Sequence, residues 1–175
     1  LQTPEFLYLK GLPTAELDRL KKRAAFILRL LCENMEKSAF RPFKTELKFG
    51  FGNEGLPPVE LEVDGIKVRL RGVIDRVDKW KDNVIVVDYK SKKASTMLVE
   101  PLSVAKGERI QTFIYMAALL KSDKSLKPAG VFYLPLGNDY VPKSMTRNRY
   151  YYVGFASNDP EIVRACDPEN TGELY

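Results

Sequence analysis

The stretch from Arg71 to Lys90 constrains the fold of this chain most, because its pattern is that of a β-hairpin. Residues 71–79 and 84–90 are rich in valine and isoleucine, and the polar run Lys81-Asp82-Asn83 separates them. Two β-rich segments around a short polar run are typical of antiparallel strands joined by a tight turn. The stretch therefore predicts two neighbouring strands at the centre of a sheet.

The expected register of this hairpin brings acidic residues together. If Lys81 and Asp82 form the turn, Asp75 lies opposite Asp88, and Lys90, two residues further along, projects from the same face. Two carboxylates and one ammonium group are then expected to emerge side by side from an apolar surface. The apolar residues predicted on that face are Val73, Val77, Val84 and Val86.

Such a carboxylate pair favours a divalent cation. Like charges directly opposite each other destabilise a sheet, and burying them without partners costs several kcal/mol or shifts their pKa. A hard cation such as Mg²⁺ removes this cost, since it prefers carboxylate oxygens, water and phosphate. Two other interpretations stay open: a solvent-facing sheet with scattered charge, or an ordinary ion pair between Asp88 and Lys90. A single β-bulge would also move Asp75 to the other face.

Three ordered motifs give the chain a family resemblance. They are Gly72-Val-Ile-Asp-Arg-Val-Asp78, Val87-Asp-Tyr-Lys-Ser91 and Gln111-Thr-Phe-Ile-Tyr115. Together they resemble the RecB-type branch of the PD-(D/E)XK nucleases, and most of all the nuclease domain of AddB-type helicase–nuclease subunits. Residues 40–50 and 128–133 extend the likeness, which covers roughly residues 17–166.

The resemblance implies phosphodiester hydrolysis with Mg²⁺ or Mn²⁺. Asp75 and Asp88 would hold one or two ions, and the backbone carbonyl of Tyr89 would add a ligand. Lys90 would orient the attacking water or offset the negative charge of the transition state. The expected catalytic residues are thus Asp75, Asp88 and Lys90, and the expected metal ligands are Asp75, Asp88 and Tyr89.

The resemblance also implies partners. DNA, as a single strand or a duplex end, is the expected substrate, in a helicase–nuclease complex that acts in double-strand break repair and recombination. Gln111 and Tyr115 are four residues apart and share a helix face, which would reach the active centre or the DNA. Lys92 and Lys93 would contact the DNA backbone, although a solvated loop explains them equally well.

Some family features have no counterpart here. No residue matches the acidic residue or histidine that the family carries on an upstream helix. Only Cys166 lies where an AddB-type iron–sulfur cluster has cysteines, so no cluster is expected. The first residue is Leu rather than Met, and we expect a piece of a longer protein, with weak metal affinity and little activity by itself. A nuclease-like module that binds DNA or serves as a scaffold without catalysis is the alternative.

Composition excludes several other kinds of site. The chain has 175 residues, a net charge of +5 and no histidine, which excludes His–Cys zinc sites and Ser-His-Asp triads within it. Two lone cysteines favour a reducing compartment, and neither a membrane-spanning apolar run nor a signal-peptide pattern is present. The expected location is the cytoplasm, with no membrane partner.

The remaining pattern predicts a single α+β domain, with a restriction-endonuclease-like core and a mostly antiparallel mixed sheet flanked by helices. Residues 1–13 are expected to be a lead-in and residues 167–175 a tail. Asp64-Gly65 predicts a hairpin turn whose second strand continues into the central hairpin, and residues 92–108 are expected to be irregular. The helices are predicted at 14–35, 108–121 and 159–165, and the other strands at 44–50, 59–63, 66–70, 131–136 and 149–155.

Overall fold

The computed structural model describes residues 13–91, 99–137 and 152–169. The chain divides into two compact units, Leu1–Glu36 and Lys37–Tyr175. The first unit contains helix α2, Thr14–Lys37, which begins at the place that the apolar periodicity predicts and ends at the boundary between the units. The expectation of a single nuclease-like domain stays a prediction.

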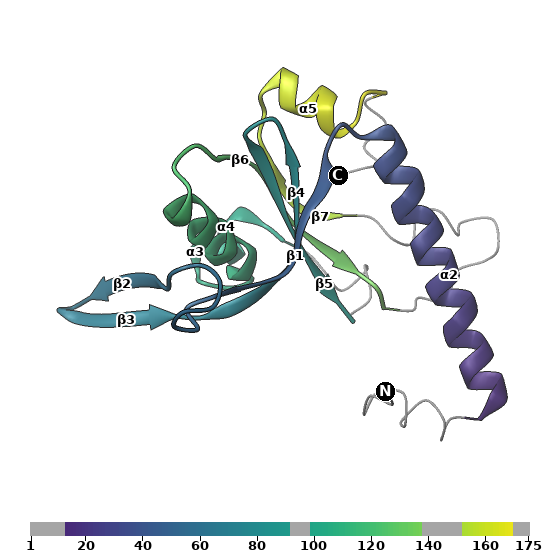
Figure 1. The fold of residues 1–175 in the computed structure, drawn as a ribbon, viewed down its shortest axis with the longest axis horizontal. Coiled ribbons are helices and arrows are strands. Elements are labelled where there is room, and N and C mark those ends of the chain that lie inside the picture. Colours follow the sequence, from purple (N-terminus) through teal and green to yellow (C-terminus); the bar gives the residue numbers. More distant parts are fainter. Residues whose placement is uncertain (1–12, 92–98, 138–151, 170–175) are drawn as a thin grey trace. The chain divides into compact units, whose positions relative to one another are not determined.

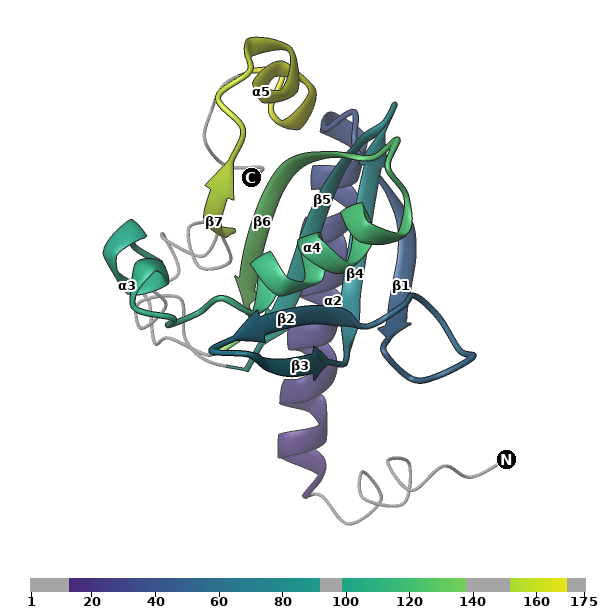
Figure 2. The ribbon, with the colours of Figure 1, turned by 90° about the vertical axis from the view of Figure 1, so that its left-hand side faces the viewer.

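The second unit is built on a five-stranded mixed sheet with the order β1-β4-β5-β6-β7 (Figure 2). Its strands pair antiparallel except for β5 and β6, which run parallel. The sheet therefore has the mixed and mostly antiparallel character that the sequence predicts. The strands are β1 (Arg41–Phe49), β4 (Gly72–Trp80), β5 (Asn83–Lys90), β6 (Lys127–Pro135) and β7 (Val153–Ala156).

The central hairpin of β4 and β5 has the predicted register. Trp80 pairs with Asn83 and Val77 with Val86, and Lys81 in the turn has a φ of 53°, the left-handed conformation that tight hairpin turns require. The pairing ends at Arg76 and Val87, one residue before the two aspartates. The strands thus separate at the level where the sequence places its acidic pair.

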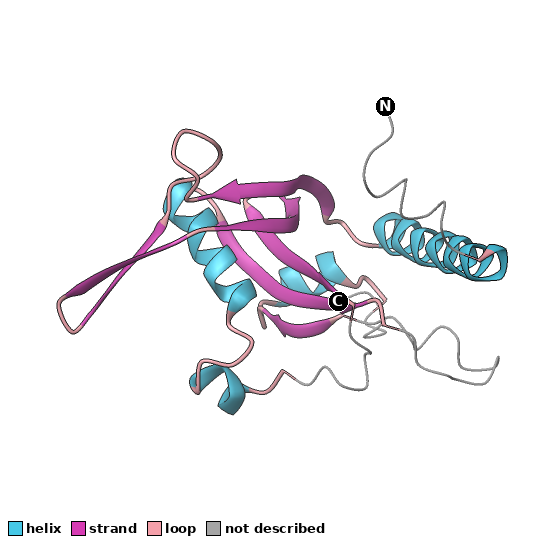
Figure 3. Cartoon of the chain, turned by 90° about the horizontal axis from the view of Figure 1, so that it is seen from below, coloured by secondary structure: helices cyan, strands magenta, loops and turns pink. Residues whose placement is uncertain are grey.

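Strands β2 (Val59–Val63) and β3 (Ile66–Leu70) form a two-stranded sheet of their own, which projects from the five-stranded sheet as a ribbon (Figures 1 and 3). The Asp64-Gly65 turn is confirmed, with φ values of 52° and 78°. The predicted continuous meander is wrong, because the chain leaves strand geometry between β3 and β4, at Arg71. One face of the ribbon is apolar and exposed, with Leu61 47%, Val63 56%, Ile66 67% and Val68 39% accessible.

Helix α4 (Gln111–Ser122) lies across one face of the sheet and packs against β5 and β6 (Figure 2). Its buried side chains include Tyr115, Met116 and Leu119, which join a core with Val77, Val84 and Val86 of the central hairpin. The apolar face of the hairpin is therefore covered by the helix that carries the third sequence motif.

Other elements differ from the sequence expectations. Strand β1 begins at Arg41 and includes Pro42, which an edge strand tolerates because one side of it forms no ladder hydrogen bonds. A short helix, α3 (Pro101–Ala105), lies within the stretch expected to be irregular, and Pro101 stands at its first turn. Helix α5 (Pro160–Cys166) matches its prediction, and the Asp159 side chain caps it by accepting from Glu161 N at 2.8 Å. Residues 149–151 of the last predicted strand lie outside the described residues.

Candidate active site

The Lys90 ammonium group is fixed by partners from two elements. Its Nζ lies 2.6 Å from Asp88 Oδ2 on the same strand and donates to Gln111 Oε1 of α4 at 2.6 Å. The ring of Tyr133, on β6, lies 5.5 Å from the same nitrogen. A lysine has four rotatable bonds, so these contacts hold a cation that would otherwise move freely.

Asp88 is a buried acid with unused acceptor capacity. Only 2% of the residue is accessible. Lys90 lies at ion-pair distance from Oδ2 but outside hydrogen-bond angles, so this oxygen accepts no hydrogen bond from any residue that the structure describes. Burial raises the pKa of Asp88 above its usual range although Lys90 opposes the rise, and the Asp75 carboxylate adds to it.

Asp75 lies where the sheet is locally irregular. Its Oδ2 accepts a hydrogen bond from the Tyr89 backbone N–H at 2.8 Å, in place of further ladder pairing between β4 and β5. On the other side, Glu46 of β1 stands opposite Asp75 by register and has a φ of 49°, which is uncommon for a residue other than glycine. Such irregularities cluster at functional sites, and this one surrounds an acid that is predicted to bind metal.

Gln111 connects Lys90 to Tyr115. Since an ammonium group can only donate, the Gln111 oxygen must face Lys90, and its amide nitrogen then donates to the Tyr115 hydroxyl. Burial raises the pKa of Tyr115, and the charges of Asp88 and Asp75 add to the rise. The four-residue spacing of the third motif thus places both side chains beside the predicted active centre.

A cleft of about 620 Å³ adjoins these residues. Lys90, Gln111 and Tyr115 line it, whereas Asp75 and Asp88 are not among the lining residues of the described chain. Sequence reasoning missed Arg71, Arg109 and Tyr133, which also line the cleft. A signal for Tyr133 existed, because the parallel pairing of β5 with β6 sets it beside Asp88, but that register could not be known beforehand. The rest of the lining is Phe49, Leu70, Gly107, Ile110 and Ile114.

Arg76 takes part in a different network, as its predicted position on the other face of β4 implies. It binds Asp78 through Nε at 2.8 Å and donates to the hydroxyls of Tyr89 at 3.1 Å and Tyr152 at 3.2 Å. Burial alone would lower the pKa of Arg76, but the bond to Asp78 and the tyrosines raise it. None of these residues lines the cleft.

Two of the predicted DNA contacts, Lys92 and Lys93, lie outside the described residues, so they stay predictions. Cys32 is an exposed free thiol and Cys166 a buried one. In the described ranges, no helix has the length and apolarity that crossing a membrane requires.

A family model for the PD-(D/E)XK nuclease superfamily matches residues 3–170. This chain belongs to that superfamily. The family resemblance seen in the three motifs is therefore confirmed, and the α+β sheet with α4 on its face is the core of a PD-(D/E)XK nuclease.

Curated relatives of this PD-(D/E)XK chain are named as the B-type subunit of an ATP-dependent helicase/deoxyribonuclease. The relative from Symbiobacterium thermophilum is 31% identical over 98% of the chain. Those from Clostridium kluyveri and Clostridium novyi are 33% and 35% identical over 86% and 71% of it. The chain spans only 16%, 14% and 12% of the length of these three proteins.

PD-(D/E)XK nucleases use divalent metal ions, and the acidic residues of this chain fit one. Asp88 offers a buried oxygen that accepts no hydrogen bond from the described residues, and Asp75 supplies a second carboxylate nearby. Carboxylate and carbonyl oxygens suit hard cations such as Mg²⁺ and Mn²⁺. In the described parts of the chain, no group of three or more acidic, histidine or cysteine side chains gathers as a complete ligand set.

Proposed function

We propose that this chain is the nuclease domain of a helicase–nuclease subunit that hydrolyses DNA phosphodiester bonds during double-strand break repair. The observation that carries the proposal is the fixed group formed by Asp88, Lys90 and Gln111, with Asp75 close enough to influence the pKa of Asp88. The superfamily and the deoxyribonuclease names of the relatives support it.

Asp75, Asp88 and the backbone carbonyl of Tyr89 would hold Mg²⁺ or Mn²⁺ in this proposal. When bound, such an ion lowers the pKa of a coordinated water and stabilises the charge that develops on the scissile phosphate. The protein's own contribution is to hold the two carboxylates in place. The hydrogen bond from Tyr89 N to Asp75 fixes one of them, and burial of Asp88 beside Lys90 fixes the other.

Lys90 would place its positive charge where the transition state gains negative charge. The contact with Gln111 keeps the ammonium group at the edge of the cleft, where 30% of the Lys90 side chain is accessible. A preorganised charge needs no rearrangement during the reaction, which is the main source of electrostatic catalysis. Gln111 is therefore proposed as a positioning residue for Lys90.

The proposed partners are DNA and a helicase–nuclease partner subunit, by analogy with the names of the relatives. The net charge of +5 suits a polyanionic substrate. Gln111, Tyr115, Lys92 and Lys93 remain the proposed DNA contacts. A module that binds DNA without cleaving it is the second candidate, favoured by the lack of a third acidic ligand among the described residues.

The test is cleavage of single-stranded DNA by the full-length protein with Mg²⁺ or Mn²⁺. We expect Asp88→Asn to reduce kcat by roughly 100-fold or more. Asp82→Asn is the matched control, since Asp82 is an exposed carboxylate in the turn at the other end of the same hairpin. It should retain the wild-type rate.

Equal cleavage by wild type and Asp88→Asn would remove Asp88 from the mechanism. Salt-sensitive DNA binding by a wild-type protein that does not cleave with either ion would instead favour the non-catalytic module.

A further inference from the structure

We propose that the cleft beside Lys90 receives one unstacked nucleotide of single-stranded DNA, with Arg71 and Arg109 as its phosphate contacts. This inference rests on the proposed nuclease function and extends it to the form of the substrate. Neither arginine belongs to the three sequence motifs in a catalytic role, but both line the same cleft as Lys90, Gln111 and Tyr115.

The charge of the cleft is suited to phosphate. Arg71, Lys90 and Arg109 line it, and no acidic side chain is among the described residues that do. The first residues of α4 lie on the same wall, and the α4 N-cap residue, Ile110, makes no side-chain capping bond. The positive end of a helix dipole then adds to the attraction for an anion. Because Lys90 is already paired with Asp88, the two arginines are the cations available to a bound phosphate from opposite segments of the chain.

The shape of the cleft favours a single strand. Its volume of about 620 Å³ falls within the range of about 300–1,000 Å³ that is common for small-molecule sites. Stacked and paired bases of an intact duplex cannot enter such a space, whereas an unstacked nucleotide can. Phe49, Ile110 and Tyr133 provide apolar and aromatic surface for its base.

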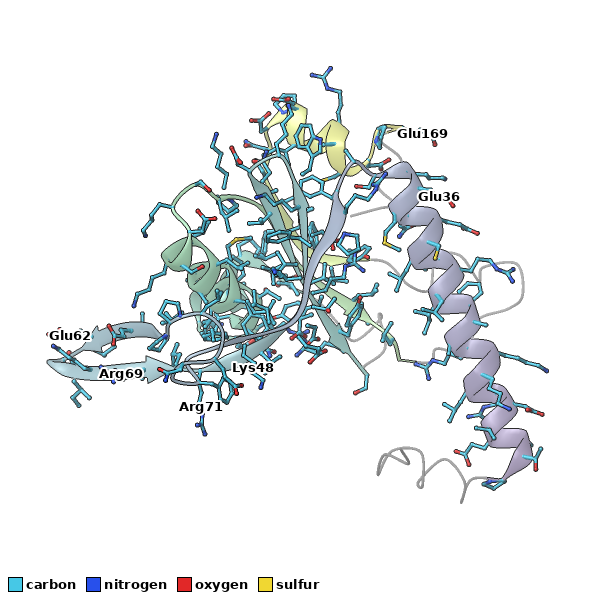
Figure 4. The ribbon with its side chains drawn as sticks, in the orientation of Figure 1. Glu36, Lys48, Glu62, Arg69, Arg71 and Glu169 are labelled. Atoms are coloured by element: carbon cyan, nitrogen blue, oxygen red, sulfur yellow. The ribbon has the colours of Figure 1, made fainter. Side chains whose placement is uncertain are left out.

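Each arginine is held in place by the fold. Arg71 lies at the base of the β2–β3 ribbon (Figure 4), and its guanidinium carbon is 5.5 Å from the centre of the Phe51 ring. Arg109 precedes α4 with a φ of 53°, and its carbonyl accepts a hydrogen bond from Tyr133 Oη at 2.7 Å. A non-glycine residue held in the left-handed region at a cleft wall is a feature typical of binding sites.

The test is photo-crosslinking of the full-length protein, in EDTA, to oligothymidylate that carries one 4-thiothymidine. Mass spectrometry should place adducts on residues of the cleft, such as Phe49, Ile110 or Tyr133. Replacing both arginines, by Arg71→Gln with Arg109→Gln, should reduce the cleft adducts by about tenfold or more, since each loses a charge-assisted contact. It should also lower the slope of log affinity against log salt by about 1.4, at about 0.7 per phosphate contact.

Two further variants separate binding from folding. Arg69→Gln is the matched control, because Arg69 is 76% accessible and pairs with Glu60 on the ribbon, outside the cleft (Figure 4). Arg69→Gln should leave the adducts unchanged. Arg109→Gly suits the left-handed backbone, so it should keep the fold and still lose adducts.

The outcomes distinguish this inference from the proposed function. Cleft adducts from a protein that fails to cleave after Mg²⁺ is added would uphold the inference and refute catalysis. Cleavage by a protein whose adducts lie elsewhere, or whose adducts persist in the double arginine variant, would overturn the inference alone. Equal adducts from a blunt duplex would also overturn it.

Discussion

The individual acid with the largest consequences is Asp88. Burial raises its pKa above the usual range even though the Lys90 ammonium group lies 2.6 Å away. Desolvation therefore outweighs the ion pair, and the ionised carboxylate destabilises the folded chain when no cation is bound. Function and stability make opposite demands on this one side chain, as is common at active sites.

Asp88→Asn should therefore stabilise the metal-free protein at neutral pH. A raised folded-state pKa means that the folded state holds its proton more tightly than the unfolded state. The penalty is absent below the unfolded pKa of about 3.9, grows as pH rises through the folded pKa, and is complete above it. Urea unfolding in EDTA at pH 7 and at pH 3.5 measures the difference, which should be present at pH 7 and vanish at the lower pH.

Adding Mg²⁺ should narrow or reverse that difference, because the ion stabilises only a folded state that binds it. The asparagine of the variant offers no carboxylate to the ion. A wild-type protein that is more stable than the variant in EDTA at pH 7 would contradict this account of the buried charge.

Among the elements, helix α4 joins the core to the predicted site. Its buried face packs on the central hairpin, and its first turn brings Gln111 to Lys90. The position of Gln111 therefore depends on the packing of Met116 and Leu119 further along the same helix. The four-residue spacing in the sequence predicted a shared face, but the contact with Lys90 depends on how α4 crosses the sheet.

Gln111→Ala should lower kcat by roughly 10- to 100-fold, since it removes a hydrogen bond to a charged group. KM should change much less if Gln111 acts by holding Lys90, whereas a larger effect on KM would indicate direct DNA binding. Steady-state cleavage of single-stranded DNA separates the two. Ser122→Ala, at the other end of α4, is the control, because its hydroxyl donates to Leu119 O at 2.8 Å, away from the site, and should leave both constants unchanged.

The elements themselves could be predicted where a local pattern determines them. Turn chemistry at Lys81 and Asp64 fixed both hairpin registers, because a tight turn allows few alternatives. The separation of the β2–β3 ribbon from the main sheet could not be predicted, since it follows from the bend at Arg71 and from the β1–β4 pairing across a long loop. The cleft was missed for the same reason, because its wall combines segments far apart in the sequence.

At the scale of the whole second unit, a buried ion pair joins distant parts of the chain. Arg76 and Asp78 have side chains that are 6% and 1% accessible, with Arg76 Nη2 2.5 Å from Asp78 Oδ2. Arg76 also reaches Tyr89 on β5 and Tyr152 before β7. Burial raises the pKa of Tyr152 to about 12, so its hydroxyl stays protonated near neutral pH.

Asp78→Ala should lower the free energy of unfolding by about 3–5 kcal/mol, because Arg76 would keep a buried charge without its partner. Denaturant unfolding of the metal-free protein measures the loss. Arg69→Ala removes one partner of the exposed pair with Glu60 and should cost less than about 1 kcal/mol. A similar small cost for both variants would show that the buried pair does not hold the unit together.

The predicted site residues come from three separate segments, and the sequence motifs named them before any geometry was available. What the motifs could not supply was the connection between them. The Lys90–Gln111 contact, the Tyr89 N–H bond to Asp75 and the irregular backbone at Glu46 depend on neighbours across the sheet. Periodicity describes each segment alone, so it is silent about such contacts.

The amphipathic β2–β3 ribbon also affects how the chain behaves when purified. Its exposed row of Leu61, Val63, Ile66 and Val68 is backed by charged residues such as Glu60 and Arg69 on the opposite face. A narrow apolar ribbon with open edges allows strands from other molecules to add to it. Colloidal stability at high concentration is therefore limited by this small part of the molecule, and threonine in place of Val63 and Ile66 is the natural starting point for improving solubility, because it keeps the β-branched shape.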